Sequence, residues 1–153
     1  MTTTLKYEVK SREIDAQRVA TIRKRVPMTA VGQAMGEGFG EVARAVETIG
    51  AEIDGLPFAI HHSVSPEEVD VEIGFPVIGD VEVGRVHTGT LDGGLVACTV
   101  HMGPYEEVGS AYEAVSGWVQ LHGKRVIGSP REVYLNEPAQ GVVPLTEVQM
   151  LLA

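Results

Sequence analysis

RVATIRKRVP (Arg18 to Pro27) and LVACTVHMGP (Leu95 to Pro104) repeat one pattern, and this repeat determines the expected architecture. Three pairs of identical residues align at a single offset of 77 positions: Val19 with Val96, Ala20 with Ala97, and Pro27 with Pro104. Each stretch is typical of a β-strand whose proline ends the run where a helix can begin. We therefore expect an internal duplication.

A helical pattern follows each of the two prolines. Apolar and ring-bearing residues recur at three- and four-residue spacing, as on the buried face of an amphipathic helix: Val31, Met35, Phe39, Val42, Val46 and Ile49 in the first half, and Val108, Ala111, Tyr112, Val115, Trp118, Val119 and His122 in the second. Gly50 and Gly123 follow these segments, where a left-handed residue commonly ends a helix. Pro57 and Pro130 come next at the same offset of 73 residues, so the first helical segment or its connection is slightly longer.

Three further strands are expected in each half. They are LKYEVKSREI (5–14), PFAIHH (57–62) and VDVEIGFPV (69–77) in the first half, and VEVGRVHTGTL (81–91), PREVYLN (130–136) and PLTEVQMLLA (144–153) in the second. The turn Asp92-Gly93-Gly94 predicts a hairpin between the strand that ends at Leu91 and the strand that begins at Leu95.

The order of these elements is β-β-α-β-β, twice. One such half has a small core, so the two halves are expected to join their sheets and to pack both helices on one face. The expected fold class is α+β: an antiparallel sheet, two long helices and a groove between them. We expect one domain over residues 1–153, with pseudo-repeats at roughly 5–78 and 81–153, since this length suits a single domain.

Composition excludes several classes of protein. The formal net charge of −9 argues against binding of a nucleic-acid backbone, so we expect no direct contact with nucleic acid. No apolar stretch is long enough to span a membrane, and the N-terminus lacks the apolar segment of a signal peptide. The single cysteine, Cys98, lies in an apolar run and is expected to be a small core residue, which suits a cytoplasmic location.

The histidines do not predict a metal site. His61 and His62 are neighbours in a strand, so they face opposite ways and cannot chelate one ion. His87, His101 and His122 show no ligand spacing, and we expect each of these imidazoles to be exposed or half-buried, with no metal and no cofactor. GEGFG (36–40) lies in a helical pattern and lacks the lysine of a phosphate loop, so it indicates a kink or a close packing contact.

Glu132 is the strongest candidate for a functional residue. It lies in the short strand at 130–136, where alternation places Glu132 and Tyr134 on one face and Val133 on the other. In a partly apolar pocket, such a carboxylate would attract a cation strongly, because little water screens it. The alternative is an ordinary ion pair with Arg131 or a lysine at a sheet edge.

Aromatic residues are concentrated near this strand. Trp118, Tyr112 and Tyr105 lie in or at the start of the second helical segment, although the chain has only eight aromatic residues in all. An aromatic stripe at helical spacing is often part of a core, but here it also suits a ligand pocket. Phe39 and Phe58 are the candidates in the first half to close the groove.

Three segments of the second half resemble the GyrI-like superfamily: HMGPYEEVGSAYEAVSGWV (101–119), GSPREVYLNEP (128–138) and PLTEVQMLL (144–152). That bacterial superfamily comprises the effector-binding domains of AraC- and MerR-type multidrug regulators and stand-alone gyrase-inhibitor-like proteins. The resemblance covers nearly the whole chain and implies an SHS2-like duplication with a ligand groove between two helices. It also implies that a buried glutamate, here Glu132, meets lipophilic cations between aromatic side chains. The aromatic residue of the family's last strand is replaced here by Gln149.

Three functions follow as hypotheses. The first is a binding domain for small amphipathic, cationic aromatic molecules, whose site comprises Glu132, Tyr134, Trp118, Tyr112, Tyr105, Phe58, Phe39 and Gln149. The second is a hydrolase of cyclopropyl DNA-alkylating compounds, in which Glu132 and Tyr134 are catalytic. The third is a protein-interaction module that modulates a gyrase-like partner.

Overall fold

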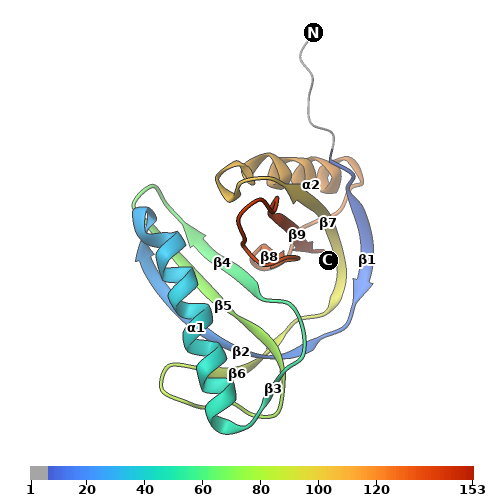
Figure 1. Cartoon of the computed structure of the whole chain (residues 1–153). Coiled ribbons are helices and arrows are strands. Elements are labelled where there is room, and N and C mark those ends of the chain that lie inside the picture. The colour runs from blue at the N-terminus through green and yellow to red at the C-terminus, as the bar shows by residue number, and fades with distance from the viewer. Residues whose placement is uncertain (1–6) are drawn as a thin grey trace.

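The computed structural model describes residues 7–153, so the first two residues of the strand expected at 5–14 lie outside it (Figure 1). The strands are β1 (Lys10–Ile14), β2 (Gln17–Pro27), β3 (Glu52–Ile53), β4 (Phe58–Val64), β5 (Glu68–Ile78), β6 (His87–Leu91), β7 (Gly94–Met102), β8 (Arg131–Tyr134) and β9 (Leu145–Leu151). The helices are α1 (Val31–Ile49) and α2 (Gly109–Leu121), each preceded by a short 3₁₀-helix, η1 (Met28–Ala30) and η2 (Tyr105–Glu107). None of the helices in this part of the chain has the length and apolar content to cross a membrane.

The strands form one curled antiparallel sheet, and its order displays the duplication. The order is β1-β7-β9-β8-β4-β5-β2-β6, with β3 paired to β5. The order is the same when it is read from either edge. It begins with an outer strand (β1 or β6) and the strand before a helix (β7 or β2), and it continues with the last strand of that half (β9 or β5) and the strand at the junction of the halves (β8 or β4). The two halves meet where β8 pairs with β4, and there Glu132 faces Ala59. The predicted α+β fold is confirmed.

The predicted hairpin at Asp92-Gly93-Gly94 is wrong, because the outer strands are exchanged between the halves. β6 pairs with β2, and β1 pairs with β7, so β6 and β7 do not pair with each other. The same register continues across both pairings. Ile14 faces Gly94, and Gln17, three residues after Ile14, faces Leu91, three residues before Gly94. Residues 10–21 and 87–98 therefore form one long antiparallel ribbon that passes from one half of the sheet to the other.

Gly93 explains why this ribbon can cross. A Cβ atom at this position would lie 2.4 Å from the amide nitrogen of Ala16 and 2.6 Å from the carbonyl oxygen of Ile14. Since the backbones touch there, a residue with a side chain does not fit. The glycines that suggested a turn instead permit a close approach of two backbones.

The helix boundaries follow the same pattern in both halves. Pro27 and Pro104 have the same extended backbone (φ −58°, ψ 143°), and a 3₁₀ turn separates each from its helix. Tyr105 therefore lies in η2 and not in α2. Gly50 and Gly123 have positive φ values (76° and 65°), so the predicted helix ends are confirmed.

Both helices pack on the same face of the sheet. α1 covers β2 and β5, and α2 covers β7 and β9 (Figure 1). The largest apolar cluster joins α1 to its strands through Ile22, Val42, Val46, Val71 and Ile73, and a second joins α2 to its strands through Ala97, Val115, Val119, Val148 and Met150. A smaller cluster lies on the opposite face of the sheet and contains Val19, Phe58 and Leu91, with Ile60 and Val133 against it.

The glycines of α1 give a prediction for stability. Gly38 is a close packing contact, as expected, since a Cβ there would lie 2.2 Å from Cδ1 of Ile73, whereas a Cβ on Gly36 would meet nothing within 4 Å. Gly36→Ala should raise the free energy of unfolding by about 0.5–1 kcal/mol, because alanine favours the helix. Gly38→Ala should give no such increase in the free energy of unfolding, because its methyl group would clash with Ile73. Urea denaturation measures the free energy of unfolding of both variants. Equal effects of the two substitutions would contradict the packing of α1 on β5.

Candidate ligand-binding site

Glu132 lies at the centre of the sheet and points toward the helices. β8 is short and is paired on both sides, with β4 and with β9. Glu132 is only 7% exposed, and Tyr134 lies on the same face, while Val133 packs into the cluster on the opposite face. The predicted alternation along this strand is confirmed.

Two tyrosine hydroxyl groups hold the carboxylate. Tyr112 in α2 donates a hydrogen bond to Oε2 of Glu132 at 2.5 Å, and Tyr134 donates to Oε1 at 2.9 Å. Burial, together with the charge of Glu132, raises the pKa of Tyr112 and of Tyr134 well above the usual value, so both hydroxyls keep their protons. Each oxygen of the carboxyl group accepts one hydrogen bond and keeps a further lone pair free.

No fixed cation balances this carboxylate. Among residues 7–153, no lysine or arginine nitrogen lies within 4.0 Å of Glu132. Arg131, the partner that an ordinary ion pair would require, lies on the other face of the sheet, where it donates to the backbone oxygen of Asp92 at 2.8 Å. The basic group nearest to the carboxylate is the imidazole of His61, whose Nδ1 lies 3.8 Å from Oε2 and has no hydrogen-bond partner.

Aromatic rings from four elements form a cluster that includes Tyr134, one of the two residues that bond to the carboxylate. Tyr134 makes edge-to-face contacts with Phe39 of α1 and with Tyr105 of η2, at ring-centre distances of 5.9 and 5.7 Å. Phe39 also contacts Phe75 of β5 at 5.7 Å. Tyr105 is 38% exposed and is the outermost ring of this group. Partial burial, with Glu132 nearby, raises its pKa as well.

Three of the residues predicted for the site lie elsewhere. Phe58 faces Val133 across the β4–β8 pair and is buried on the opposite face of the sheet. Gln149 faces Arg131 and donates a hydrogen bond to Glu147, also on that opposite face. Trp118 packs against the apolar cluster of α2 and stacks on His122, at a ring-centre distance of 4.0 Å.

Sequence reasoning missed two residues of the site, His61 and Phe75. Strand alternation separates His61 from His62 as expected, and His62 bonds to Glu72 on the opposite face. The pairing of β4 with β8 brings His61 beside Glu132, and the sequence alone does not determine the register of this pairing. The expectation of exposed or half-buried imidazoles is wrong for His101, which is 2% exposed.

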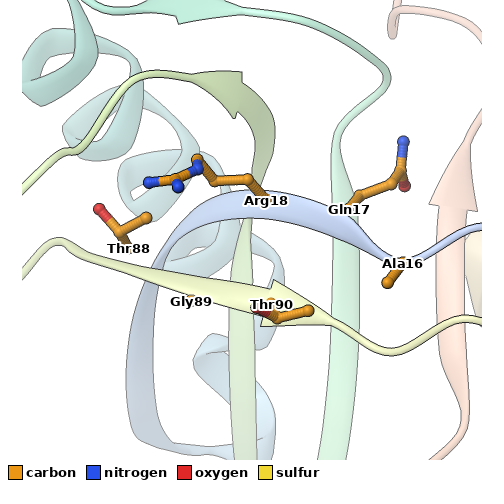
Figure 2. A pocket seen from close by; sticks show the side chains of 6 residues that line it. All are labelled: Ala16, Gln17, Arg18, Thr88, Gly89 and Thr90. Atoms are coloured by element: carbon orange, nitrogen blue, oxygen red, sulfur yellow. The ribbon is translucent and has the colours of Figure 1, made fainter.

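Two cavities of the described structure are not lined by Glu132. One, of about 360 Å³, is a shallow depression on β2 and β6, where Arg18 extends toward Thr88 (Figure 2). Arg18 is already paired there with Asp80, which leaves little reason for a ligand to bind. The other, of about 390 Å³, adjoins α2 and is lined by several acidic residues, among them Glu106, Glu107 and Glu113. Since Glu132 is only 7% exposed, a ligand would have to displace neighbouring side chains to reach it.

The Tyr112 hydroxyl provides a test of the charged state of Glu132. Tyr112→Phe should lower the free energy of unfolding by about 1.5–3 kcal/mol, because hydrogen bonds to ionised groups contribute this much. Tyr7→Phe is the matched control, since its hydroxyl bonds to the imidazole of His101 at 2.9 Å and should cost about 0.5–1.5 kcal/mol. Urea denaturation measures the loss of unfolding free energy in both variants. If Tyr112→Phe loses no more than Tyr7→Phe, the carboxyl group of Glu132 is not ionised.

Similar folds occur among solved structures. The C-terminal domain of EcmrR matches with a TM-score of 0.85 and 21% sequence identity, over 97% of this chain and 99% of that domain. EcmrR in its complex with DNA matches over 95% of this chain (TM-score 0.83, 21% identity), and this chain spans 57% of the length of that protein.

Two more distant structures share the fold. A hydrolase from Listeria innocua has a TM-score of 0.69 and 13% identity, over 95% of this chain and 92% of the hydrolase. SAV2435 bound to tetraphenylphosphonium has a TM-score of 0.62 and 12% identity, over 97% of this chain and 94% of that protein. Identities this low establish only the fold.

The sequence itself identifies the family. No curated protein matches the chain. The family of GyrI-like small molecule binding domains, however, matches residues 7–152, which is nearly the whole chain. The similarity of fold to the EcmrR domain extends over the same part of the chain. This chain belongs to the GyrI-like family of small-molecule binding domains.

Proposed function

We propose that the ligand of this domain is an amphipathic, cationic aromatic molecule and that Glu132 supplies the charge which attracts it. The observation that carries the proposal is a carboxylate with 7% exposure that has no lysine or arginine within 4.0 Å in the described structure. A buried charge without a counter-ion is costly, and a ligand that brings a positive charge removes that cost.

The surroundings of Glu132 suit the remaining part of such a ligand. Tyr134 bonds to the carboxylate, and Phe39 and Tyr105 make edge-to-face contacts with Tyr134. Aromatic faces attract cations and also cover apolar groups, so one set of rings serves both halves of an amphipathic molecule. The structure of SAV2435, which shares this fold, contains tetraphenylphosphonium, a lipophilic cation.

Entry would take place past Tyr105. This ring is the most exposed of the group and lies in a short 3₁₀-helix, which has fewer hydrogen bonds to hold it than α2 has. A ligand that displaces Tyr105 reaches Tyr134 and then Glu132. In the complex, the rings of Phe39 and Tyr134 would line the binding site.

A pair of probes of opposite charge tests the proposal. Tetraphenylphosphonium and tetraphenylborate have nearly the same shape, but one is a cation and the other an anion. Titration calorimetry should show binding of the phosphonium and at least about tenfold weaker binding of the borate, since a difference of only about 1.4 kcal/mol gives this ratio. Equal affinity for both probes would leave apolar contact as the cause and would refute the role of charge.

Hydrolysis is a second candidate, which one observation favours. Glu132 lies beside a proton donor, Tyr134, and beside an imidazole, so the site holds groups for acid–base chemistry. When water opens a cyclopropane conjugated to a carbonyl, Glu132 would accept the proton of water. The oxygen of water would bond to the ring carbon as the carbon–carbon bond breaks, and the electron pair of that bond would move to the carbonyl group. The carbonyl oxygen would accept a hydrogen bond from Tyr134, and the enolate would then take the proton from Glu132.

Mass spectrometry distinguishes the two candidates. The protein is incubated with a cyclopropyl alkylating compound, and the product that has gained one water molecule is measured against buffer and against the Glu132→Gln variant. Turnover by the wild type alone would establish a hydrolase. A rate equal to that of buffer would leave ligand binding as the function of the site.

A further inference from the structure

His61 is a residue of the proposed site that has a buried and unpaired ring nitrogen. Its Nδ1 atom makes no hydrogen bond to any of the residues that the structure describes, and it lies 3.8 Å from Oε2 of Glu132. The side chain as a whole is 16% exposed. Buried polar atoms in proteins almost always have partners, so an unpaired nitrogen that faces a carboxylate requires an explanation.

The duplication explains how His61 reaches this position. Ala59 faces Glu132 at the centre of the β4–β8 pair. At the 73-residue offset between the halves, His61 corresponds to Tyr134, two residues beyond this centre on the other strand. The two side chains therefore occupy equivalent places on either side of Glu132. Tyr134 bonds to Oε1, and His61 faces Oε2.

Glu132 is the acidic group that faces His61 in the described structure. Of the other polar groups on this face that can titrate, His101 of β7 lies three strands away from β4. The others near His61 are phenols, which keep their protons, and one lysine. They are Tyr134 from β8, Tyr112 from α2, Tyr105 from η2, and Lys24 from β2. Lys24 lies two strands away, because His61 faces Val71 of β5 and Val71 faces Lys24. Its ammonium group donates to the backbone oxygen of Ala34. The charge of Glu132 is thus the principal charge that His61 meets.

We propose that the proton of His61 competes with the cationic ligand for Glu132, so that His61 determines when the site accepts a cation. With a protonated imidazole, Glu132 already has a counter-ion, and a second cation is repelled. With a neutral imidazole, the carboxylate has no counter-ion, and the ligand supplies one. Binding of a cation and binding of a proton therefore exclude each other, which favours permanent cations such as quaternary phosphonium and ammonium compounds. This inference rests on the proposed function of Glu132.

The affinity for tetraphenylphosphonium as a function of pH tests the inference. The probe carries its charge at every pH, so any pH dependence comes from the protein. In the wild type, the affinity should fall roughly tenfold between about pH 8 and pH 5.5, the range in which imidazoles gain their protons. His61→Gln and His61→Leu should both bind with nearly constant affinity over this range. Two variants are used because the leucine could disturb the packing that the polar glutamine preserves.

His62→Gln is the matched control. This neighbouring histidine faces the opposite side of the sheet and bonds to Glu72, so its removal should leave the pH profile of the wild type unchanged. If the His61 variants that bind the probe keep the profile of the wild type, the inference is wrong although the proposed function stands. If the wild type binds the probe at no pH, the proposed function itself is wrong, and the inference fails with it.

Discussion

Replacement of Glu132 by glutamine should weaken the binding of tetraphenylphosphonium by at least about 30-fold. The expected loss is about 2 kcal/mol, which is the attraction between two unit charges roughly 6–8 Å apart at a partly buried protein site. Glutamine has the size of glutamate and can still accept a hydrogen bond from Tyr134 or Tyr112, so the fold should persist. Titration calorimetry of the two proteins at the same pH measures the difference.

Glu113→Gln is the control for this experiment. Glu113 is an exposed residue of α2 that lines the acidic cavity, and its replacement removes the same charge from the same region of the molecule. The affinity should change less than about twofold, because water screens an exposed charge. A larger effect of Glu113→Gln than of Glu132→Gln would place the cation in the acidic cavity instead.

Replacement of Gly93 by alanine should be the most destabilising small change in the ribbon. A Cβ atom at this position would lie within 2.6 Å of three backbone atoms, one each from Ile14, Asp15 and Ala16. Backbone atoms at a strand crossing cannot move aside as the end of a side chain can, so the crossing itself has to shift. We expect a loss of about 3 kcal/mol in the free energy of unfolding and a decrease in melting temperature of about 6–12 °C.

Gly89→Ala provides the comparison for Gly93→Ala. Gly89 lies four residues earlier, in β6, and a Cβ added there would meet nothing within 4 Å. Its replacement should change the free energy of unfolding by less than about 0.5 kcal/mol. Thermal denaturation followed by circular dichroism measures both variants. Similar melting temperatures for the two would show that the backbones do not approach each other at Gly93, and the exchange of outer strands would then be wrong.

The duplication was predictable from the sequence, but the exchange of strands was not. The repeat at Val19 and Val96 and the shared spacing of the glycines and prolines are local patterns, and both halves have the predicted order of elements. Asp92-Gly93-Gly94 has the composition of a hairpin turn, yet the pairing of β6 with β2 is a contact between residues far apart in the chain. Local turn chemistry carries no information about such a contact.

The site was predictable to the extent that a single strand or helix determines it. Alternation along β8 correctly placed Glu132 and Tyr134 together. Phe58 was misplaced because its face depends on the register of β4 against β8, which pairs it with Val133. Trp118 was misplaced for a simpler reason: it lies six residues after Tyr112, and six residues turn a helix by roughly 240°. Helical geometry alone would have separated the two.

The crystal structure of the protein with tetraphenylphosphonium would test the role of Glu132 most directly. Our account predicts the phosphonium on the helix face of the sheet, next to the Glu132 carboxylate, with its rings against Phe39 and Tyr134 and with Tyr105 displaced. A phosphonium bound elsewhere, with the hydrogen bonds of Tyr112 and Tyr134 to Glu132 unchanged and Tyr105 in its present place, would contradict it.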